Sequence, residues 1–207
     1  MNPSVQALRK KFAEPIKRAV VSCGDTIVYV EAGKLHDVIE FLKTDPGQDY
    51  SYLVDVTAVE YRDAERPLEL VYELFSMQRG APLRVKVELD KSDELVVDSV
   101  VDLFNGANWL EREVYDMFGV RFEGHPDLRR ILMWETYAEG HPLRKDFPLR
   151  GRFSRSEQVR QALNANPEAH YSMNELSIAE EYLELPLDMR ERLARGERGT
   201  VGDPENQ

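Results

Sequence analysis

Residues 50–90, YSYLVDVTAVEYRDAERPLELVYELFSMQRGAPLRVKVELD, decide the fold of this chain. The stretch contains three apolar runs, at residues 50–59, 68–75 and 83–89. Apolar and charged residues alternate strictly in the third run, which is typical of a strand with one face exposed to water. The connections RDAER and QRGA are short enough to join adjacent antiparallel strands. The sequence therefore predicts a three-stranded antiparallel meander.

The same pattern predicts how each strand faces the core. The first run places on one face Tyr52, Val54, Val56 and Ala58. The second run is apolar on much of both faces, which is typical of a central strand. We therefore expect the second strand to lie between the other two, and the third to be half exposed.

Before the meander, the pattern predicts two helices and a strand. A helical stripe formed by Val5, Leu8, Phe12 and Ile16 predicts an amphipathic helix over residues 4–19, which Pro15 kinks or divides. Residues 26–30 predict a short strand. A second stripe, which ends at a Pro-Gly turn at residues 46–47, consists of Leu35, Val38, Ile39 and Leu42.

After the meander, two more helices are predicted. The first covers residues 96–104 and ends at an Asn-Gly pair. The second covers residues 108–118; Asn108 followed by Glu111 resembles a capping arrangement, and Gly119 stands where a C-terminal cap belongs. Because the meander strands are separated from these helices, we predict an α+β fold: a mostly antiparallel sheet with helices packed on one face, followed by an extended irregular C-terminal arm.

The chain divides into three parts by pattern and charge. Residues 1–120 form the predicted α+β globular domain, and residues 21–120 carry nine basic and 21 acidic side chains. Residues 121–155 form an irregular strip rich in Gly, Pro and Arg, with eight basic and five acidic side chains. Residues 156–207 form the predicted C-terminal arm with a mobile end, carrying five basic and 11 acidic side chains. The basic strip is either a solvated loop or a docking strip for an acidic partner.

Composition narrows the functional classes. The 207 residues carry a net charge of -11, which argues against general nucleic-acid binding. The single cysteine, Cys23, excludes a disulfide framework and an iron–sulfur cluster held by this chain alone. No segment has the roughly 20 apolar residues that a transmembrane helix needs, so we expect any membrane association to be peripheral.

Charged residues cluster around the last predicted helix and the basic strip. Glu111, Arg112, Glu113 and Asp116 lie on the helix. A spacing of three puts Glu113 and Asp116 side by side on one face, where these carboxylates are either solvated or able to bind a metal or share a proton. A near repeat follows, with Gly-His-Pro at residues 124–126 and again at 140–142. One interpretation is a zinc or iron site made by Glu113, Asp116, His125 and His141. The other is a pair of turns whose imidazoles bond to backbone or carboxylate groups.

A long signature then identifies a family. The runs EREVYDMFG (111–119), GHPDLRRIL (124–132) and GHPLRKDFP (140–148) resemble the signature region of the C subunit of the proton-pumping NADH:quinone oxidoreductase, respiratory complex I. The resemblance is ungapped over residues 109–149. The residues after about 155 show no such match.

The resemblance implies a structural subunit of the hydrophilic arm. Such a subunit binds no cofactor of its own; FMN, iron–sulfur clusters and quinone belong to partner subunits. It holds the quinone-pocket subunit and nearby iron–sulfur subunits together, for electron transfer from NADH to quinone coupled to proton translocation. The resemblance also implies a peripheral position on the cytoplasmic face of a prokaryotic cell membrane.

Under this resemblance no residue is catalytic or metal-binding. Twelve charged residues are instead expected to meet a partner subunit or to organise the loop: Glu111, Arg112, Glu113, Asp116, His125, Asp127, Arg129, Arg130, His141, Arg144, Lys145 and Asp146. Charges of both signs that are buried at an interface must be paired, which suits so dense a set. Two alternatives stay open: the corresponding subunit of a related membrane-bound hydrogenase or cofactor dehydrogenase, and a free-standing metal hydrolase.

Overall fold

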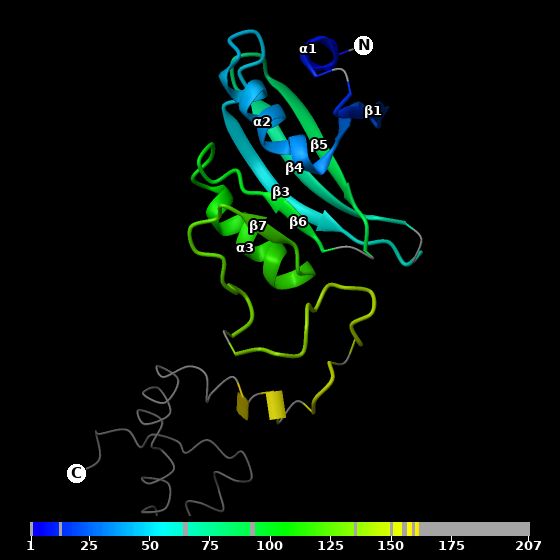
Figure 1. Cartoon of the computed structure of the whole chain (residues 1–207), viewed down its shortest axis with the longest axis vertical. Coiled ribbons are helices and arrows are strands. Elements are labelled where there is room, and N and C mark those ends of the chain that lie inside the picture. Colours follow the sequence, from blue (N-terminus) through cyan, green and yellow to red (C-terminus); the bar gives the residue numbers. More distant parts are fainter. Residues whose placement is uncertain are drawn as a thin grey trace, which may run out of the picture. The chain divides into compact units, whose positions relative to one another are not determined.

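A five-stranded sheet forms the centre of the fold in a computed structural model of the chain (Figure 1). The structure describes residues 2–12, 14–63, 66–91, 94–134, 136–149, 151–154, 157–158 and 160–161. The strands lie in the order β1-β2-β5-β4-β3. Their bounds are β1 Ile16–Ser22, β2 Asp25–Val30, β3 Tyr52–Val59, β4 Leu68–Ser76 and β5 Ala81–Leu89.

The predicted meander is confirmed. Strands β3, β4 and β5 pair with one another as antiparallel neighbours, and β4 lies between the other two. Most side chains of β4 are buried on both faces, as expected of a central strand. On its other side β5 pairs in parallel with β2, and β2 pairs antiparallel with β1. The sheet is therefore mostly antiparallel, as predicted.

Strand β1 corrects the prediction of a helix over residues 4–19. Helix α1 spans only Pro3–Lys11, and the chain from Ile16 onward is a strand. Ile16 continues the helical spacing of the preceding residues, but it lies opposite Val30 of β2. Cys23 and Gly24 have φ angles of 52° and 94°, which is the backbone of a tight hairpin turn. Pairing across this hairpin overrides the local helical pattern.

A β-bulge corrects the predicted face of β3. The register of β3 against β4 shifts between Leu53 and Asp55. One extra residue in a strand reverses the faces of the side chains before it. Consequently Leu53 is buried with Val56 and Ala58, whereas the side chains of Tyr52 and Val54 are exposed.

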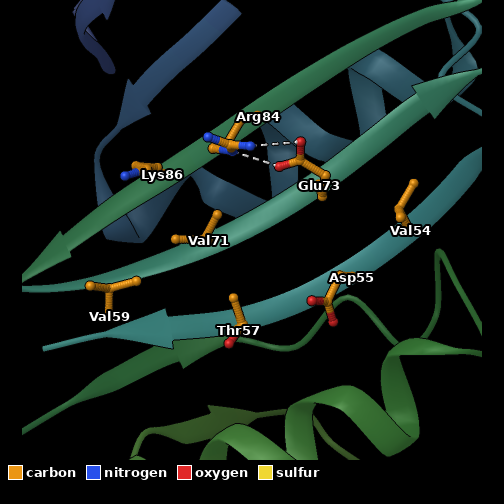
Figure 2. A pocket seen from close by; sticks show the side chains of 8 residues that line it. All are labelled: Val54, Asp55, Thr57, Val59, Val71, Glu73, Arg84 and Lys86. Atoms are coloured by element: carbon orange, nitrogen blue, oxygen red, sulfur yellow. Dashed lines mark hydrogen bonds and ion pairs between the residues drawn. The ribbon is translucent and has the colours of Figure 1, made fainter. Parts of the chain in front are cut away.

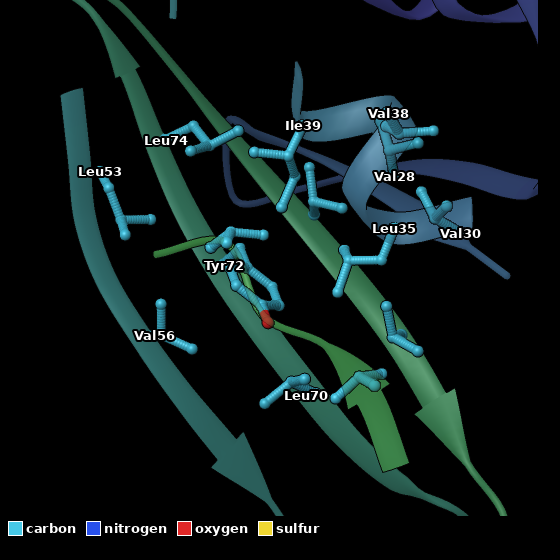
Figure 3. Packing of buried hydrophobic residues seen from close by; sticks show 14 of the residues in the cluster. Val28, Val30, Leu35, Val38, Ile39, Leu53, Val56, Leu70, Tyr72 and Leu74 are labelled. Atoms are coloured by element: carbon cyan, nitrogen blue, oxygen red, sulfur yellow. The ribbon is translucent and has the colours of Figure 1, made fainter. Parts of the chain in front are cut away.

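The hydrophobic core lies between one face of the sheet and the helices. Helix α2 spans Leu35–Thr44, after a short 3-10 turn η1 at Ala32–Lys34, and helix α3 spans Ala107–Phe118. The stripe predicted for α2 faces the sheet, and Figure 3 shows Leu35 and Ile39 in the same buried cluster as Val28 and Tyr72 of the strands. Val114 of α3 belongs to the same buried cluster. The apolar pattern predicted for α2 thus identifies the face that it buries.

The prediction of a helix over residues 96–104 is wrong. Val96–Asp98 forms strand β6, which pairs in parallel with β7 at Arg121–Glu123 (Figure 1). Residues 101–103 form a turn that leads into α3. The β-branched valines favour a strand, and the partner strand lies more than 20 residues away, so no local signal decides the pairing.

The predicted α+β fold class is confirmed. Residues 1–154 form one compact unit, and residues 155–207 belong to a second. Among the described residues no helix is long and apolar enough to cross a membrane. The division at residues 120 and 155 stays a prediction, and most of the predicted C-terminal arm lies outside the described residues.

Candidate functional site

Helix α3 buries three charged side chains beside its apolar face. Glu111 and Asp116 are fully buried, and Arg112 nearly so. Gly119 ends the helix with a φ of 83°, as the sequence predicts for a C-terminal cap. Charged groups are buried only when they are paired or hydrogen-bonded. Their partners lie in the irregular chain after α3, which we call the loop segment (residues 119–149), and in the turn before α3.

Asp116 binds the loop segment through both carboxylate oxygens. Its Oδ2 accepts hydrogen bonds from the backbone N–H groups of Ile131 (3.1 Å), Leu132 (2.8 Å) and Met133 (2.8 Å). Its Oδ1 accepts a hydrogen bond from Nη1 of Arg130 at 2.6 Å. One carboxylate thus satisfies three consecutive backbone donors and one guanidinium.

The electrostatics of Asp116 favour the ionised form. Burial alone would raise the pKa of this carboxyl, because it removes the charge from water. The hydrogen bonds from Met133 and Arg130, with those from Leu132 and Ile131, outweigh burial and lower the pKa below its ordinary value. Asp116 is therefore held as an anion with a full set of donors.

Arginine and histidine side chains satisfy backbone carbonyls of the same region. Arg112 donates to the carbonyls of Arg129 and Arg130, each at 3.2 Å. Arg130 donates to the carbonyl of Gly140 at 3.0 Å. Nδ1 of His141 donates to the carbonyl of Asp116 at 2.9 Å. Backbone groups in irregular chain lack the regular hydrogen bonds of helices and sheets. These side chains supply hydrogen-bond partners for those backbone groups.

Glu111 binds the turn before α3 and does not cap the helix. Its carboxylate accepts hydrogen bonds from Oγ of Ser99 (2.7 Å) and from the backbone N–H of Val100 (2.8 Å). The N-cap of α3 is Gly106, and no side chain in the described part of the chain caps this helix end, so the predicted capping arrangement of Asn108 and Glu111 is wrong. Burial raises the pKa of Glu111 to about 7, although the bonds from Ser99 and Val100 oppose this shift.

A further buried carboxylate, Glu60, has no counterpart in the sequence prediction. It follows β3, and its Oε2 accepts a hydrogen bond from the backbone N–H of Lys145 at 2.7 Å. Nε of Arg144 lies 3.5 Å from the same oxygen and 3.8 Å from Oδ1 of Asp146, and Nζ of Lys91 lies 3.7 Å from Oε1 of Glu60. Glu60 and Lys145 are 85 residues apart along the chain, so no local pattern could reveal the site.

The first Gly-His-Pro repeat forms a turn near the surface. The backbone N–H of Asp127 donates to Nδ1 of His125 (3.0 Å), so Nε2 carries the proton and donates to the carbonyl of Asn108 (3.1 Å). Arg129 pairs with Asp127 at 2.8 Å, and both side chains are more than half exposed. The interpretation as a turn whose imidazole bonds to backbone groups therefore describes the His125 geometry.

The four residues of the predicted metal set do not form a metal-binding group. Glu113 is exposed, both ring nitrogens of His125 are engaged, and Asp116 is saturated by the loop segment. Within the described ranges, no group of three or more His, Cys, Asp or Glu side chains could hold a metal ion. The described part of the chain therefore contains no metal site of the kind that a metal hydrolase needs.

Several large apolar side chains of the loop segment are exposed. They are Leu132, Leu143 and Leu149, and Leu149 is completely exposed. A hollow of about 770 Å³ lies beside the last two and is also lined by Arg62, Arg144 and Lys145. Exposed apolar residues grouped in this way are typical of interaction surfaces.

The open face of the sheet differs from this surface. A hollow of about 450 Å³ lies over β3, β4 and β5 on the face away from the core. Figure 2 shows Arg84 joined to Glu73 by two hydrogen bonds across the strands. Lys86 pairs with Glu69 at 2.7 Å. These charges pair across neighbouring strands, so they satisfy one another on this face of the sheet.

Sequence comparison assigns most of the described chain to one family model. The model described as "Respiratory-chain NADH dehydrogenase, 30 Kd subunit" matches residues 28–153. Proteins named as the C subunit of NADH-quinone oxidoreductase are similar over 144 residues, with 43% identity in Chelativorans sp. (strain BNC1) and 42% in Brucella ovis. Each alignment covers 70% of this chain and 70% of the relative.

Two solved structures share the fold. A trypsin-resistant fragment (1–134) of Nqo5 is 28% identical, with a TM-score of 0.51, and the match covers 60% of this chain and 98% of the fragment. A chain in the membrane-bound sulfane sulfur reductase, an archaeal respiratory membrane complex, is 26% identical, with a TM-score of 0.57. That match covers 76% of this chain and 87% of the other.

Proposed function

We propose, from the premise that this chain belongs to the family of the 30 kDa subunit of respiratory-chain NADH dehydrogenase, that it is a structural subunit of the hydrophilic arm. In this proposal it binds no cofactor and carries out no redox step itself. It holds neighbouring subunits at fixed positions, so that electrons pass from NADH to quinone and proton translocation follows.

One observation carries the proposal: buried side chains fix the loop segment to the globular domain. Asp116 and Glu60 accept hydrogen bonds from backbone N–H groups of the loop segment. Arg112 and His141 donate hydrogen bonds to backbone carbonyls. These groups are directed at the backbone of their own chain. They are therefore positioned to organise the loop, as a scaffold requires, and not to attack a substrate.

The predicted site residues divide into two sets under this proposal. The buried set, with Asp116 and Arg130 at its centre, organises the loop segment. The exposed set, which includes Glu113, Arg129 and Lys145, is available to partner subunits. Exposed charges at the edge of an interface steer association and select the partner more than they add affinity.

The partners proposed are the quinone-pocket subunit and the nearby iron–sulfur subunits. FMN, the iron–sulfur clusters and quinone would then be bound by those partners. The proposed location is peripheral, on the cytoplasmic face of a prokaryotic membrane. The family membership supports this placement, and so does the resemblance in the 109–149 signature.

Purification of the tagged chain from its own cells tests the proposal. We expect the other hydrophilic-arm subunits to co-purify, together with NADH:quinone oxidoreductase activity. The isolated chain should contain neither flavin nor iron in stoichiometric amount. Stoichiometric flavin or iron in the isolated chain, or purification without any arm subunit, would contradict the proposal.

A second candidate function is the corresponding subunit of a related respiratory membrane complex. The similarity to a chain of the archaeal membrane-bound sulfane sulfur reductase favours it, because that match covers 76% of this chain. The same purification separates the two candidates. Co-purified subunits that oxidise NADH support the first, and hydrogenase-type or sulfur-reducing subunits support the second.

A further inference from the structure

The surface around residues 142–149 contains two neighbouring hollows. The larger, of about 770 Å³, is lined by Pro142, Leu143 and Lys145 among others. The smaller, of about 300 Å³, has His141 in its lining. Arg144 and Phe147 line both, so the two hollows adjoin there. We call this pair the double hollow.

The larger half of the double hollow is cationic. Its lining includes Arg62, Arg144 and Lys145, and no Asp or Glu among the described residues. Arg62 and the side chain of Lys145 are exposed. This is unusual in a chain with a net charge of -11. Guanidinium groups bind carboxylates in a bidentate manner, so the charge favours an acidic ligand.

Arg144 is held in position within this surface. Its Nε lies 3.5 Å from Glu60, and the side chain is 20% exposed. The same Nε lies 3.8 Å from Oδ1 of Asp146. The guanidinium of Arg144 is therefore fixed where it lines both hollows.

Apolar side chains complete the surface. The larger half is also lined by Leu143, Phe147 and Leu149, and the first and last of these are 50% and 103% exposed. The smaller half adds Leu95 and Phe118. A small inorganic anion would leave the exposed Leu143 and Leu149 in water. A ligand that covers them must carry large apolar side chains as well as carboxylates.

The backbone that presents these groups is fixed. The N–H of Leu143 donates to the carbonyl of Met117 at 3.0 Å, and that of Lys145 donates to Glu60 at 2.7 Å. The N–H of Phe147 donates to the carbonyl of Arg144 at 3.1 Å. A surface that is already ordered loses little conformational entropy when a partner binds.

We infer that the double hollow binds an acidic chain segment of a neighbouring subunit, one that carries at least two carboxylates beside large apolar side chains. The inference rests on the proposed function, because it requires a stable partner. Nucleic acid is disfavoured as the occupant, since the chain is acidic overall and large leucine side chains are exposed at this surface.

Site-specific photo-crosslinking in the assembled complex tests the inference. The photoreactive residue p-benzoylphenylalanine replaces Leu149 in the tagged chain, which is expressed in its own host. The matched control places it at Met77, which is 68% exposed in the turn between β4 and β5. After irradiation of the purified complex, the crosslinked peptides are identified by mass spectrometry.

The expected product at position 149 is a peptide of another subunit with two or more Asp or Glu residues and large apolar side chains. The Met77 control should not yield that peptide. A crosslink at 149 to a neutral or basic segment, to this chain itself, to nucleic acid or to no partner would overturn the inference. If no arm subunit co-purifies even without the photoreactive residue, the proposed function fails instead.

Charge reversal gives an independent readout. Arg62→Glu with Lys145→Glu should lower the yield of co-purified partner subunits by about tenfold at physiological salt. The control Arg9→Glu with Lys10→Glu makes the same change of charge at exposed positions of α1 and should keep the yield of the unmodified chain. Equal yields from both double variants, each with an unchanged melting temperature, would contradict the inference.

Discussion

The sheet and the loop segment satisfy their backbone groups by different means. In β4 the N–H and C=O groups pair with β3 and β5, while Leu70, Tyr72 and Leu74 fill the core. In the loop segment three consecutive N–H groups share the single carboxylate of Asp116. The sheet is stabilised by many similar contacts, whereas the loop segment depends on a few buried polar groups.

The two regions are therefore sensitive to different kinds of substitution. Losing one apolar contact among many weakens the sheet in proportion to the area lost. Losing one partner of a buried ion pair leaves an uncompensated charge, which costs more than the pair itself contributes. The loop segment should therefore be sensitive to single polar substitutions that leave the sheet intact.

The largest effect is expected from Asp116→Asn. The neutral amide removes the charge that pairs with Arg130, and its N–H groups would face this guanidinium, another donor. We therefore expect the side chain to leave its place and release the N–H groups of residues 131–133. We expect the free energy of unfolding to fall by about 3–5 kcal/mol, as for other broken buried pairs. Urea denaturation measures this loss, and a fall below about 1 kcal/mol would contradict the account.

A core variant of similar cost provides the matched control. Leu70→Ala should lower the free energy of unfolding by about 2–5 kcal/mol, because Leu70 is fully buried. Limited trypsin digestion then separates the two regions. We expect Asp116→Asn to be cut first at Arg129, Arg130 and Arg144, whereas Leu70→Ala should be cut throughout the chain.

The next effect depends on pH and tests the turn that precedes α3. Burial raises the pKa of Glu111 from 4.5 to about 7, with Asp102 adding to the shift. The folded state thus holds this proton more tightly than the unfolded state. The contribution to stability is full below about pH 4.5 and falls by about 3 kcal/mol as pH rises to about 7.

Glu111→Gln should remove this dependence. The amide can accept from Val100 and donate to Ser99. We therefore expect the free energy of unfolding of the variant, relative to that of the unmodified chain, to rise between pH 5 and pH 8. Glu113→Gln, an exposed neighbour on the same helix, is the control and should not change the slope. An unchanged slope in Glu111→Gln would show that the carboxyl titrates normally.

A smaller effect is expected from Gly119→Ala, at the junction between α3 and the loop segment. Gly119 has a positive φ, and an added Cβ would lie 2.7 Å from Nε2 of His141. We expect a loss of about 1–3 kcal/mol from backbone strain and displacement of the ring. Thermal unfolding measures it, and Gly33→Ala, with open space around its Cβ, is the control.

The smallest effect is expected from Arg129→Ala. Arg129 pairs with Asp127, but both side chains are more than half exposed. We expect a change in stability of about 0–1 kcal/mol, because exposed ion pairs contribute little. A loss near that of Asp116→Asn would break the distinction between buried and exposed charges of the loop segment.

The sequence pattern predicts the sheet, which is stabilised by many similar apolar contacts, better than the loop segment, which depends on a few buried polar groups. Strict alternation identifies β5, and the glycine at residue 119 marks the end of α3. Ile16 falls within a predicted helix because its pairing with β2 across the hairpin overrides the helical spacing. Val97 does so because its partner strand β7 lies more than 20 residues away and leaves no local trace. The bulge at Leu53 likewise depends on the partner strand.

The sequence predicts only part of the candidate site, because contacts between residues far apart in the chain leave no local pattern. The family signature contains Asp116, Arg130 and His141, which the structure brings together. Glu60 lies outside that signature and 85 residues from Lys145, so only the three-dimensional structure reveals it. A single acidic residue directly after a strand is common in protein sequences, so Glu60 does not by itself predict a buried site.

Hydrogen exchange of the backbone N–H groups of Ile131, Leu132 and Met133 shows whether the carboxylate of Asp116 fixes the loop segment. The account predicts that these amides are protected in the unmodified chain and exchange near the rate of a free peptide in Asp116→Asn. The amides of Leu70 and Val85 in the sheet should keep at least about 1,000-fold protection in the variant. Equal protection of residues 131–133 in both proteins would contradict the claim that a buried carboxylate fixes the loop segment.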